Sequence, residues 1–483
     1  MLISIQEVLA ITGGRLYAGN TEGCLTGALI DSREARGGEL FFPLQGERQN
    51  GHYYIIDALQ RGAAASLMEK RHLPHFQRDD FPAGKAVIVV DNCLRALQDI
   101  ASYHRNKYNV GIVAVTGSNG KTTTKDLIAS VLHTRYQVLK TEGNFNNDIG
   151  LPLTLLRLRG HHQVAVLEMG MRGMGEIALL CSLSKPDVGV ITNIGEAHLE
   201  LLGSRENISR AKGELLEAMG PEDTAILNGD DPFLRPMGEA FMGNTVFFGY
   251  DEGLDLRVYR SFFQANGYRF SVALPGGKGE DFWVPLPGRH NVYNALAALA
   301  VGLHFSLDPS EIKAGLAKTS FSRMRMERIH TTSGLKLIND AYNASPSSME
   351  LALQSLKECA GKDFSIAVLG DMLELGDYAE EGHRKTGYCL ARLGVDCLVT
   401  VGEKAALIGE GAKEAGVSPE MVFNCPDHDG ALKVLQSLPL QKAHVLVKGS
   451  RGMFMEKIVD QLLFQYDERS NVAGTGEADQ NGW

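Results

Sequence analysis

Short apolar runs alternate with amphipathic segments of helical length over most of the chain. The runs are rich in β-branched residues and apolar on both faces, which is typical of strands buried in a parallel sheet. A first series covers residues 111–116, 164–169, 188–193 and 224–228, and a second covers 335–340, 365–370, 397–402 and 444–449. Amphipathic stretches such as 347–360 and 380–393 lie between the runs. The pattern predicts two βαβ blocks and an α/β fold class.

The segment between the two series, residues 251–287, has a different character. Asn266-Gly267 is flanked by alternating apolar and polar residues, which predicts a β-hairpin, and a helix is expected over 291–303. A smaller α/β unit, in which apolar runs and helical segments are spaced differently, precedes residue 110. We therefore expect three domains, at 1–108, 109–320 and 321–465, followed by a polar, Gly-rich tail at 466–483 that we expect to be disordered.

Composition and net charge exclude several classes of protein. The 483 residues are 44% hydrophobic and 22% charged, as in globular proteins, and the formal net charge is 48 − 58 = −10. Such an acidic chain has no general affinity for nucleic acid or for anionic membranes. The seven cysteines form no C-x-x-C pair, so neither a disulfide framework nor a zinc site is indicated. The first residues lack a basic region, and no run approaches the ~18 apolar residues of a membrane span. We expect a cytoplasmic protein without membrane insertion, and a monomer.

The strongest local motif is V-A-V-T-G-S-N-G-K-T-T-T at 113–124, where a strand ends, a Gly-rich loop follows and a helix opens. This geometry aims backbone N–H groups and a helix N-terminus at a phosphate. Lys121 can reach the β- and γ-phosphates, and the Thr122 hydroxyl can ligate Mg²⁺. Val115 stands where the usual pattern has glycine, so Gly117 takes the turn; the alternative is a plain strand-to-helix turn. The residues expected to contact ATP here are Thr116, Gly117, Ser118, Asn119, Gly120, Lys121, Thr122 and Thr123.

The shortened loop T-G-S-N-G-K-T resembles that of the Mur ligase superfamily of ATP-dependent, amide-forming enzymes. Further motifs of that family follow in order: E-M-G (168–170), N-I-G-E-A-H (193–198), A-K-G-E (211–214), G-R-H-N-V-Y-N (288–294) and L-G-D-M-L-E-L-G (369–376). The resemblance covers residues 25–460. It implies a small α/β domain for a uridine nucleotide, a central P-loop ATPase domain with a parallel sheet, and a C-terminal Rossmann-like domain that binds the incoming dipeptide.

The resemblance also implies two Mg²⁺ ions, with Thr122, Glu168, His198 and Lys212 around them. Glu168 and His198 each follow a predicted parallel strand, at the edge where open α/β sheets bind ligands. Lys212 matches a lysine that many members carry as an N-carbamate, which would turn a cation into an oxygen ligand. An ordinary helical lysine is the alternative. Catalysis is expected to depend on Lys121, His198, Lys212 and Asn144.

Further ATP contacts are implied outside the loop. Asn291 and Asn294 are three residues apart and share one helix face, where the family uses such a pair for the adenine edge; helix capping by Asn291 is the alternative. Arg325 resembles the arginine that reaches the ATP phosphates from the third domain, with Arg323 as a nearby alternative. Asp340 fits a ribose or hinge contact.

Substrate contacts are expected in two loops. The segments I-D-S-R (30–33) and G-E-R-Q-N-G-H (46–52) resemble the family's uridine-diphosphate region, and T-E-G-N-F-N-N (141–147) is expected to hold the peptide end near the γ-phosphate. The residues expected to bind the substrate are Ser32, Arg33, Gly46, Asn50, His52, Asn144 and Asn147.

The segment N-D-A-Y-N-A-S-P-S-S-M (339–349) resembles the members that add D-alanyl-D-alanine to UDP-N-acetylmuramoyl-tripeptide through an acyl phosphate. The Asp-Asn-Pro-Arg motif of the tripeptide-forming relative does not occur here. Two alternatives stay open: another ligase of the superfamily, tripeptide-forming or similar to folylpolyglutamate synthetase, and a non-catalytic P-loop protein. The sequence does not distinguish lysine from diaminopimelate as the third residue of the tripeptide.

Overall fold

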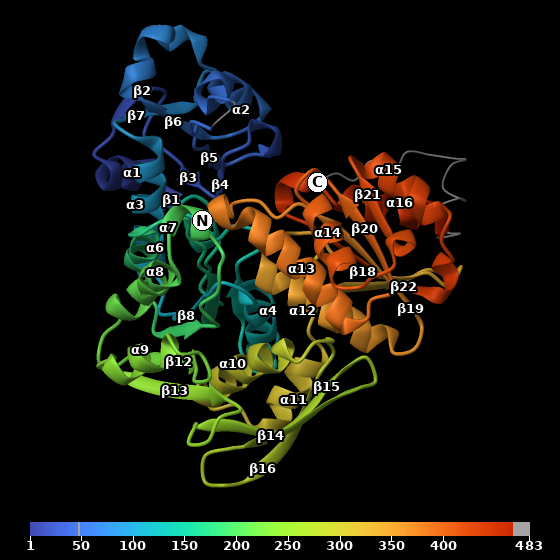
Figure 1. Cartoon of the computed structure of the whole chain (residues 1–483). Helices are drawn as coiled ribbons and strands as arrows, with labels where there is room; N and C mark the ends of the chain where they lie inside the picture. The colour runs from blue at the N-terminus through green and yellow to red at the C-terminus, as the bar shows by residue number, and fades with distance from the viewer. Residues whose placement is uncertain (47–48, 467–483) are drawn as a thin grey trace.

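The computed structural model describes residues 1–46 and 49–466, and three large sheets organise it (Figure 1). We refer to residues 1–108, 109–320 and 321–466 as the first, central and third blocks. In Figure 1 the first block is blue, the central block runs from teal to yellow, and the third block is orange to red. The predicted tail lies outside the described residues except for Tyr466, which ends helix α16 (Glu456–Tyr466).

The first block is built on a five-stranded sheet in the order β2-β7-β6-β5-β4. Its strands are β2 (Arg15–Ala18), β7 (Ala86–Val90), β6 (Ala65–Glu69), β5 (Glu39–Phe41) and β4 (Gly27–Leu29), and its helices are α1 (Ile5–Thr12), α2 (Ile55–Arg61) and α3 (Cys93–Asn106). A two-stranded ladder, β1 (Ile3–Ser4) with β3 (Cys24–Leu25), lies beside the sheet. All pairs from β4 to β7 are parallel, so their carboxyl ends meet at one edge.

The central block contains a nine-stranded sheet in the order β16-β15-β14-β13-β12-β11-β8-β10-β9. The strands are β8 (Gly111–Thr116), β9 (Val138–Lys140), β10 (Val164–Glu168), β11 (Val188–Ile191), β12 (Thr224–Asn228), β13 (Asn244–Gly249), β14 (Leu256–Gln264), β15 (Gly267–Ala273) and β16 (Gly279–Val284). Pairing is parallel from β9 to β14, and β14, β15 and β16 form antiparallel hairpins. The four predicted strands of this block are confirmed.

The predicted hairpin is also confirmed, with its turn one residue earlier than expected. Ala265 and Asn266 have positive φ angles of 52° and 61°, and Gly267 already belongs to β15. A Cβ atom at Gly267 would lie 2.2 Å from the carbonyl oxygen of Val284. The glycine is therefore needed for close approach of two backbones rather than for the turn itself.

Helices cover both faces of the central sheet. They are α4 (Lys121–Leu132), α5 (Gly150–Leu155), α6 (Glu176–Ser184), α7 (Leu199–Leu202), α8 (Arg205–Glu217), α9 (Leu234–Ala240), α10 (His290–His304) and α11 (Pro309–Ala317). Alternate residues of β8 point to opposite cores: Val113 and Val115 pack with α4 and α10, whereas Ile112 and Ala114 join the core that holds α5, α6 and α8. That second core continues into α1 and α3, which ties the first block to the central block.

The third block has a six-stranded sheet in the order β17-β18-β22-β19-β20-β21, parallel except for the edge strand β17. The strands are β17 (Glu327–His330), β18 (Lys336–Asp340), β19 (Phe364–Gly370), β20 (Cys397–Val401), β21 (Val422–Cys425) and β22 (Ala443–Lys448). The helices besides α16 are α12 (Pro346–Ala360), α13 (Ala379–Leu393), α14 (Ala406–Glu414) and α15 (His428–Gln436). The predicted second series of strands is confirmed.

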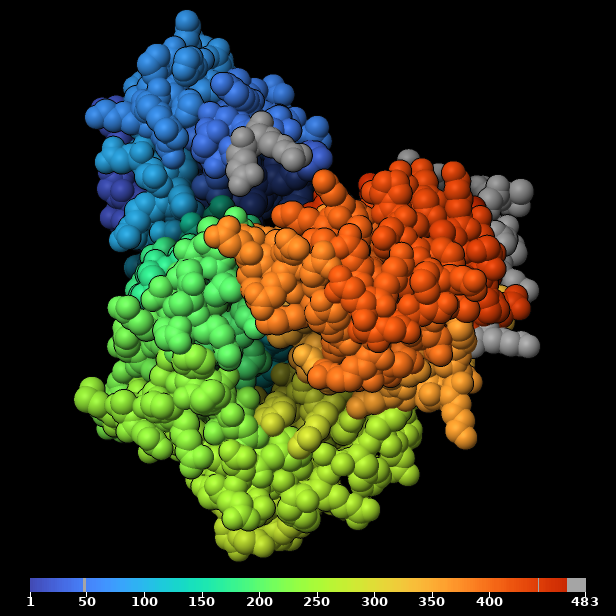
Figure 2. Space-filling view, viewed as in Figure 1, coloured from blue at the N-terminus to red at the C-terminus, as the bar shows by residue number. Residues whose placement is uncertain are grey.

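The first and third blocks both rest on the central block, and Figure 2 shows an open gap between the blue and orange surfaces above it. The linker into the third block is anchored on the P-loop helix, where Asp126 accepts hydrogen bonds from the backbone N–H and the hydroxyl of Ser322, at 2.9 and 2.7 Å. Glu358 of α12 accepts from the N–H of Gly288 at 2.8 Å. Among the described residues, no helix is both long and apolar enough to cross a bilayer.

Candidate active site

The P-loop leaves the carboxyl end of β8 and requires glycine at two positions. Gly117 and Gly120 have φ angles of 142° and 82°, and Gly120 is the residue before α4. A Cβ atom at Gly117 would lie 1.9 Å from the Thr192 hydroxyl, and one at Gly120 would lie 2.6 Å from Asn294 Oδ1. No side chain within the described ranges caps α4. The N–H groups of its first turn, which the helix itself does not use, are therefore free to face an anion.

Asn193 holds the tip of the loop. The N–H of Ser118 donates to the Asn193 carbonyl oxygen at 2.9 Å, and the N–H of Asn119 donates to Asn193 Oδ1 at 3.0 Å. The Ser118 hydroxyl accepts from the N–H of Gly195 at 2.8 Å. Because these two amides are already bonded, the amides best placed for a phosphate are those of Lys121, Thr122 and Thr123 at the start of the helix.

Lys121 folds back over the loop that precedes it. Its ammonium donates to the carbonyl oxygens of Gly117 and Ser118, at 2.8 and 3.3 Å. Burial lowers the pKa of Lys121, the nearby Glu168 carboxylate opposes this shift, and the Arg325 guanidinium adds to it. Lys121, Glu168 and Arg325 therefore share one electrostatic environment, although they come from three separate motifs.

Glu168 ends β10 and is 2% exposed. One carboxylate oxygen accepts from the side-chain amide of Asn146 at 2.8 Å, and the other, Oε2, is buried without a hydrogen-bond partner in the described part of the chain. A buried acceptor without a donor is costly, and a carboxylate oxygen is a ligand that Mg²⁺ prefers. The donor set at this sheet edge therefore fits the divalent ion that the family resemblance implies.

The loop before α5 contributes a residue that we did not predict. Asn146 contacts Glu168, whereas Asn147 accepts from the N–H of Gly150 at 2.8 Å and so stabilises the start of α5. Asn144 is exposed at the rim. Three asparagines in seven residues look alike in sequence, and only the conformation of the loop selects the one that reaches the carboxylate.

His198 and Lys212 lie beside Lys121. Burial lowers the pKa of His198, and the charges of Lys121 and Lys212 lower it further. Lys212, on α8, is 1% exposed, and no carboxylate in the described part of the chain forms an ion pair with it. Burial, followed by the charge of Lys121, holds the pKa of Lys212 well below its ordinary value. The charge of Lys121 thus acts on both His198 and Lys212, and Glu168 acts on Lys121, so three of the predicted metal-site residues share the electrostatic environment of Lys121. The fourth, Thr122, is the next residue of α4.

Asn291 and Asn294 lie next to the P-loop but bond within the protein. Asn294 donates to Asn291 Oδ1 at 2.9 Å and accepts from the Thr124 hydroxyl at 3.1 Å. Asn291 donates to the carbonyl oxygen of Pro287 at 2.6 Å. The pair holds α10 against the P-loop helix. Each amide group has a second donor or lone pair beyond these bonds, so contact with an adenine edge remains compatible with them.

Arg325 faces the loop from the third block. Its guanidinium lies 3.9 Å from the centre of the Tyr342 ring, whereas Arg323 is exposed, so the geometry favours Arg325. Both oxygens of Asp340 are used internally: one accepts from the N–H of Met326 at 3.1 Å and the other from Lys448 at 2.6 Å. Of its two predicted roles, this arrangement favours the hinge contact over the ribose contact.

The predicted substrate loops lie at the carboxyl edge of the first sheet. Ser32 is buried and bonds to Asp57, Arg33 is exposed and pairs with Asp31, and Gly46 donates its N–H to the carbonyl oxygen of Gln49 at 2.9 Å.

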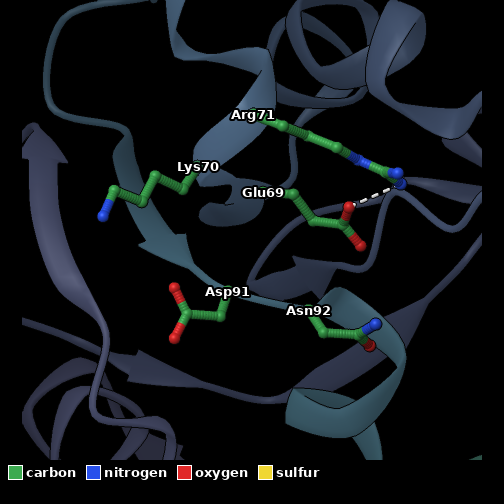
Figure 3. A pocket seen from close by; sticks show the side chains of 5 residues that line it. All are labelled: Glu69, Lys70, Arg71, Asp91 and Asn92. Carbon is green, nitrogen blue, oxygen red and sulfur yellow. Dashed lines mark ion pairs between the residues drawn. The ribbon is translucent and has the colours of Figure 1, made fainter.

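A polar pocket of about 420 Å³ lies at the ends of β6 and β7 (Figure 3). Its lining residues are Glu69, Lys70, Arg71, Asp91 and Asn92.

His52 is fully buried and supports its loop from inside. Its Nδ1 lies 2.8 Å from Asn50 Oδ1, and its Nε2 accepts from the N–H of Glu69 at 3.1 Å, so the ring is neutral with the proton on Nδ1. Burial and the neighbouring His72 lower the pKa of His52 to about 4. A direct contact between His52 and a nucleotide would require the loop to open.

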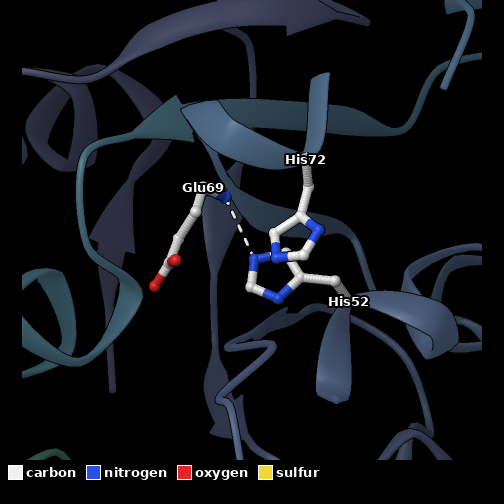
Figure 4. A group of neighbouring side chains, drawn as sticks. All are labelled: His52, Glu69 and His72. Atoms are coloured by element: carbon white, nitrogen blue, oxygen red, sulfur yellow. Dashed lines mark hydrogen bonds between the residues drawn. The ribbon is translucent and has the colours of Figure 1, made fainter. Parts of the chain in front are cut away.

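His52, Glu69 and His72 also lie close enough together to suggest a metal site (Figure 4). The two rings are stacked with centroids 3.9 Å apart and an interplanar angle of 24°. Imidazole lone pairs lie in the ring plane, so those of two nearly parallel rings do not converge on one ion. Glu69 is occupied as well, by Arg71 and by the N–H of Cys93. The cluster is a hydrogen-bonded support for the loop.

Three family models match successive parts of the chain. Residues 25–105 match the catalytic domain of the Mur ligase family, residues 115–302 match the Mur ligase middle domain, and residues 324–451 match the Mur ligase glutamate ligase domain. The chain belongs to the Mur ligase family. The expectation drawn from its motifs is confirmed.

Similar proteins place the chain among the MurF-type members of this family. It is 40% identical to the UDP-N-acetylmuramoyl-tripeptide–D-alanyl-D-alanine ligase of Bacillus subtilis over 90% of this chain and 93% of the relative. The Escherichia coli ligase of the same name is 32% identical over 95% and 98%. A crystal structure of MurF from Acinetobacter baumannii superimposes with a TM-score of 0.85 at 32% identity, covering 96% of this chain and 99% of that one. MurF from Thermotoga maritima, solved with ADP, gives 0.78 at 27% identity over 92% and 98%. The expected three-domain α/β fold is confirmed.

Proposed function

We propose that this Mur ligase adds D-alanyl-D-alanine to UDP-N-acetylmuramoyl-tripeptide with hydrolysis of ATP to ADP and phosphate, a step of peptidoglycan precursor synthesis. The observation that carries the proposal is 40% identity over 90% of the chain to a ligase of that name. The shared electrostatic environment of Lys121, Glu168, His198 and Lys212 supports it, because a non-catalytic nucleotide-binding protein has no need of the last three.

The reaction proceeds in two steps. A carboxylate oxygen of the tripeptide attacks the γ-phosphorus of ATP, the bond to the β,γ-bridging oxygen breaks, and ADP leaves with its electron pair. The free amine of D-alanyl-D-alanine then attacks the carbonyl carbon of the acyl phosphate, and phosphate leaves as the amine loses a proton. The acyl phosphate is already activated, so the protein contributes mainly positioning and electrostatic stabilisation.

The residues of the site can position the substrates and stabilise the charge that develops during phosphoryl transfer. The N–H groups at the start of α4 receive the phosphates, and Lys121 and Arg325 neutralise charge on the transferring phosphoryl group from two sides. Thr122, Glu168, His198 and Lys212 would hold two Mg²⁺ ions, which when bound supply positive charge to the phosphate oxygens. Glu168 keeps one oxygen free for this purpose because Asn146 occupies the other.

Lys212 is proposed to carry an N-carbamate. Carbamate forms when a neutral amine attacks CO₂ and loses a proton, and Lys212 is a buried amine without a carboxylate partner in the described residues. The product is an anion with two oxygens, which can ligate a hard divalent cation. A buried ammonium in the same place would repel both the metal and Lys121.

The three blocks divide the substrates. Residues 1–108 are proposed to bind the UDP-sugar peptide, with Ser32, Arg33, Gly46 and the loop supported by His52 around the nucleotide. Residues 109–320 are proposed to bind ATP, with adenine near Asn291 and Asn294 and the peptide end near Asn144 and Asn147. Residues 321–465 are proposed to bind the dipeptide and to supply Arg325 and Asp340.

Phosphate release tests the proposal. The purified chain should release phosphate only when ATP, Mg²⁺, UDP-N-acetylmuramoyl-tripeptide and D-alanyl-D-alanine are all present. Lys121→Ala should lower turnover by roughly 10³-fold, because it removes a charge that stabilises phosphoryl transfer. Lys362→Ala, which removes an exposed lysine of the third block, is the matched control and should leave turnover unchanged.

Two results would contradict the proposal. A preference for a different acceptor in a panel of UDP-muramoyl peptides, amino acids and dipeptides would assign the chain to another ligase of the superfamily. Turnover of Lys121→Ala within about tenfold of the parent would contradict the role of the loop in phosphoryl transfer. The same panel, with lysine or diaminopimelate as the third residue of the tripeptide, identifies the natural acceptor.

A further inference from the structure

One contact at the site joins the central block to the third block. His198 follows β11, and its Nδ1 lies 3.1 Å from Oε2 of Glu374, which follows β19. Both residues have left-handed backbone conformations, with φ angles of 65° and 61°. Such conformations are uncommon for residues other than glycine, so the surrounding structure must favour them. Two loops from different blocks therefore hold the imidazole and the carboxylate against each other.

The neighbourhood shows that this contact depends on docking of the third block. Helix α7, which begins after His198, lies beside the short 3₁₀ helix η5 (Gly376–Tyr378), and a Cβ atom at Gly376 would come within 3.1 Å of the Glu200 side chain. In Figure 1 the orange segment before α13 reaches the green region of α7. Arg172, also from the central block, lies 3.9 Å from the other oxygen of Glu374. Separating the two blocks would break all of these contacts.

The chemical consequence lies in which ring nitrogen keeps its lone pair. A carboxylate can only accept, so a neutral His198 donates its Nδ1–H to Glu374 and keeps the lone pair on Nε2. Histidines that ligate metals are commonly held in this way, with the second ring nitrogen bonded to a carboxylate or carbonyl group that fixes the tautomer and the ring orientation. The remaining nitrogen, Nε2, is then free to ligate a metal ion.

We infer that Glu374 is a positioning residue for His198, and that the third block completes the metal site by bringing this carboxylate when it docks on the central block. The inference rests on the proposed function, because it assigns His198 to a metal. The inference goes beyond the proposed function because it gives a role to Glu374, which is not among the residues proposed to bind metal or substrate. Glu374 also belongs to the third block, which is proposed to bind the dipeptide.

Four variants separate this role from a general structural effect. Glu374→Ala removes the acceptor. Glu374→Asp keeps the charge but shortens the side chain by one methylene, so the carboxylate no longer reaches the ring. Glu374→Gln keeps an acceptor oxygen at the same length and loses the charge. Asp377→Asn removes an exposed carboxylate three residues away and is the matched control.

The readout is binding of Mn²⁺ in the presence of ADP, measured by electron paramagnetic resonance without turnover. Loss of a partner that orients a metal ligand typically costs 10- to 100-fold in metal affinity. We expect Glu374→Ala and Glu374→Asp to weaken Mn²⁺ binding by about tenfold or more, and Glu374→Gln and Asp377→Asn to stay close to the parent. The concentration of Mg²⁺ that gives half-maximal phosphate release should shift in the same order.

Other results would overturn the inference. Unchanged Mn²⁺ binding in Glu374→Ala would show that His198 needs no support from the third block, and this would leave the proposed function untouched if phosphate release remains normal. Full binding by Glu374→Asp together with loss in Glu374→Gln would show that only the charge matters. Failure of the parent chain to bind Mn²⁺ with ADP would contradict the proposed function itself, and the inference with it.

Discussion

Acid should destabilise the first block through His52, and the size of the effect follows from the structure. His52 is fully buried and neutral, and its pKa of about 4 compares with about 6.5 in an unfolded chain. Between these values the unfolded state binds more protons than the folded state, so stability rises with pH in that interval. The contribution of His52 is complete above pH 6.5 and is lost as the pH falls toward 4.

The magnitude can be calculated from the two pKa values. Lowering the pKa of His52 from about 6.5 to about 4 corresponds to a total of about 3 kcal/mol, of which about 2 kcal/mol is lost by pH 5. Hydrogen exchange in peptides that cover 50–69 reports the local opening free energy, which a melting curve of a three-block protein does not resolve. That opening free energy should fall by about this amount from pH 7 to pH 5 after correction for the intrinsic exchange rates.

Comparison with His52→Gln isolates the effect. Glutamine can still accept from the N–H of Glu69 but does not titrate, so this variant should have a lower opening free energy at pH 7 and a flatter pH dependence. His104 titrates in both proteins, so its contribution cancels in the difference. His72 stacks on the His52 ring, so the difference reports the titration of these two rings together. His330→Gln, which alters an exposed histidine of the third block, should leave exchange in the first block unchanged. An equal pH slope in the parent and in His52→Gln would refute the reasoning.

Two further predictions concern buried lysines. If Lys212 carries a carbamate, Lys212→Ala should be nearly inactive but partly rescued by formate or acetate, whereas Lys212→Arg should stay inactive because guanidinium remains cationic; an active Lys212→Arg would contradict the carbamate. Asp340→Ala removes the only carboxylate paired with the buried Lys448 ammonium in the described residues and leaves it the carbonyl oxygen of Asn343. It should lower the opening free energy of β18 and β22 by about 3–5 kcal/mol, measured by hydrogen exchange. Adding Lys448→Met should recover part of that loss; purely additive losses would contradict a coupled pair.

The buried parallel strands were the most predictable part of the fold. Their apolar runs are continuous because both faces are covered, and the structure places them within one or two residues of the expected ranges. The strands β9, β13 and β21 were not predicted. They have three to six residues, and partly exposed positions interrupt their apolar pattern. The turn was predicted at Asn266-Gly267 but lies at Ala265 and Asn266. A glycine in a sequence does not show whether it is needed for a positive φ angle or for close approach of another backbone.

At the site, the residues next to strand ends were predictable and their partners were not. Glu168 and the P-loop follow buried strands, so sequence alone indicates the edge at which they meet. Asn146 and Glu374 act through contacts made between separate segments, and nothing near them in sequence distinguishes them from neighbouring polar residues. His52 was predicted to contact the substrate, whereas the structure buries it completely. Inside the block its Nε2 accepts from the backbone N–H of Glu69, a contact that no local sequence pattern reveals.

The site retains groups that are unfavourable in the folded chain by itself. Glu168 has a buried oxygen without a partner and Lys212 is a buried amine without a counter-charge in the described residues, and each costs stability. Hydrophobic or paired residues there would make a more stable protein, but they could not bind phosphate and metal without rearranging. Because these groups are already desolvated and oriented by Asn146 and the surrounding helices, little reorganisation is left for the moment of phosphoryl transfer. Ligands that satisfy them should in turn stabilise the folded state, since anything that binds only the native form shifts the folding equilibrium toward it.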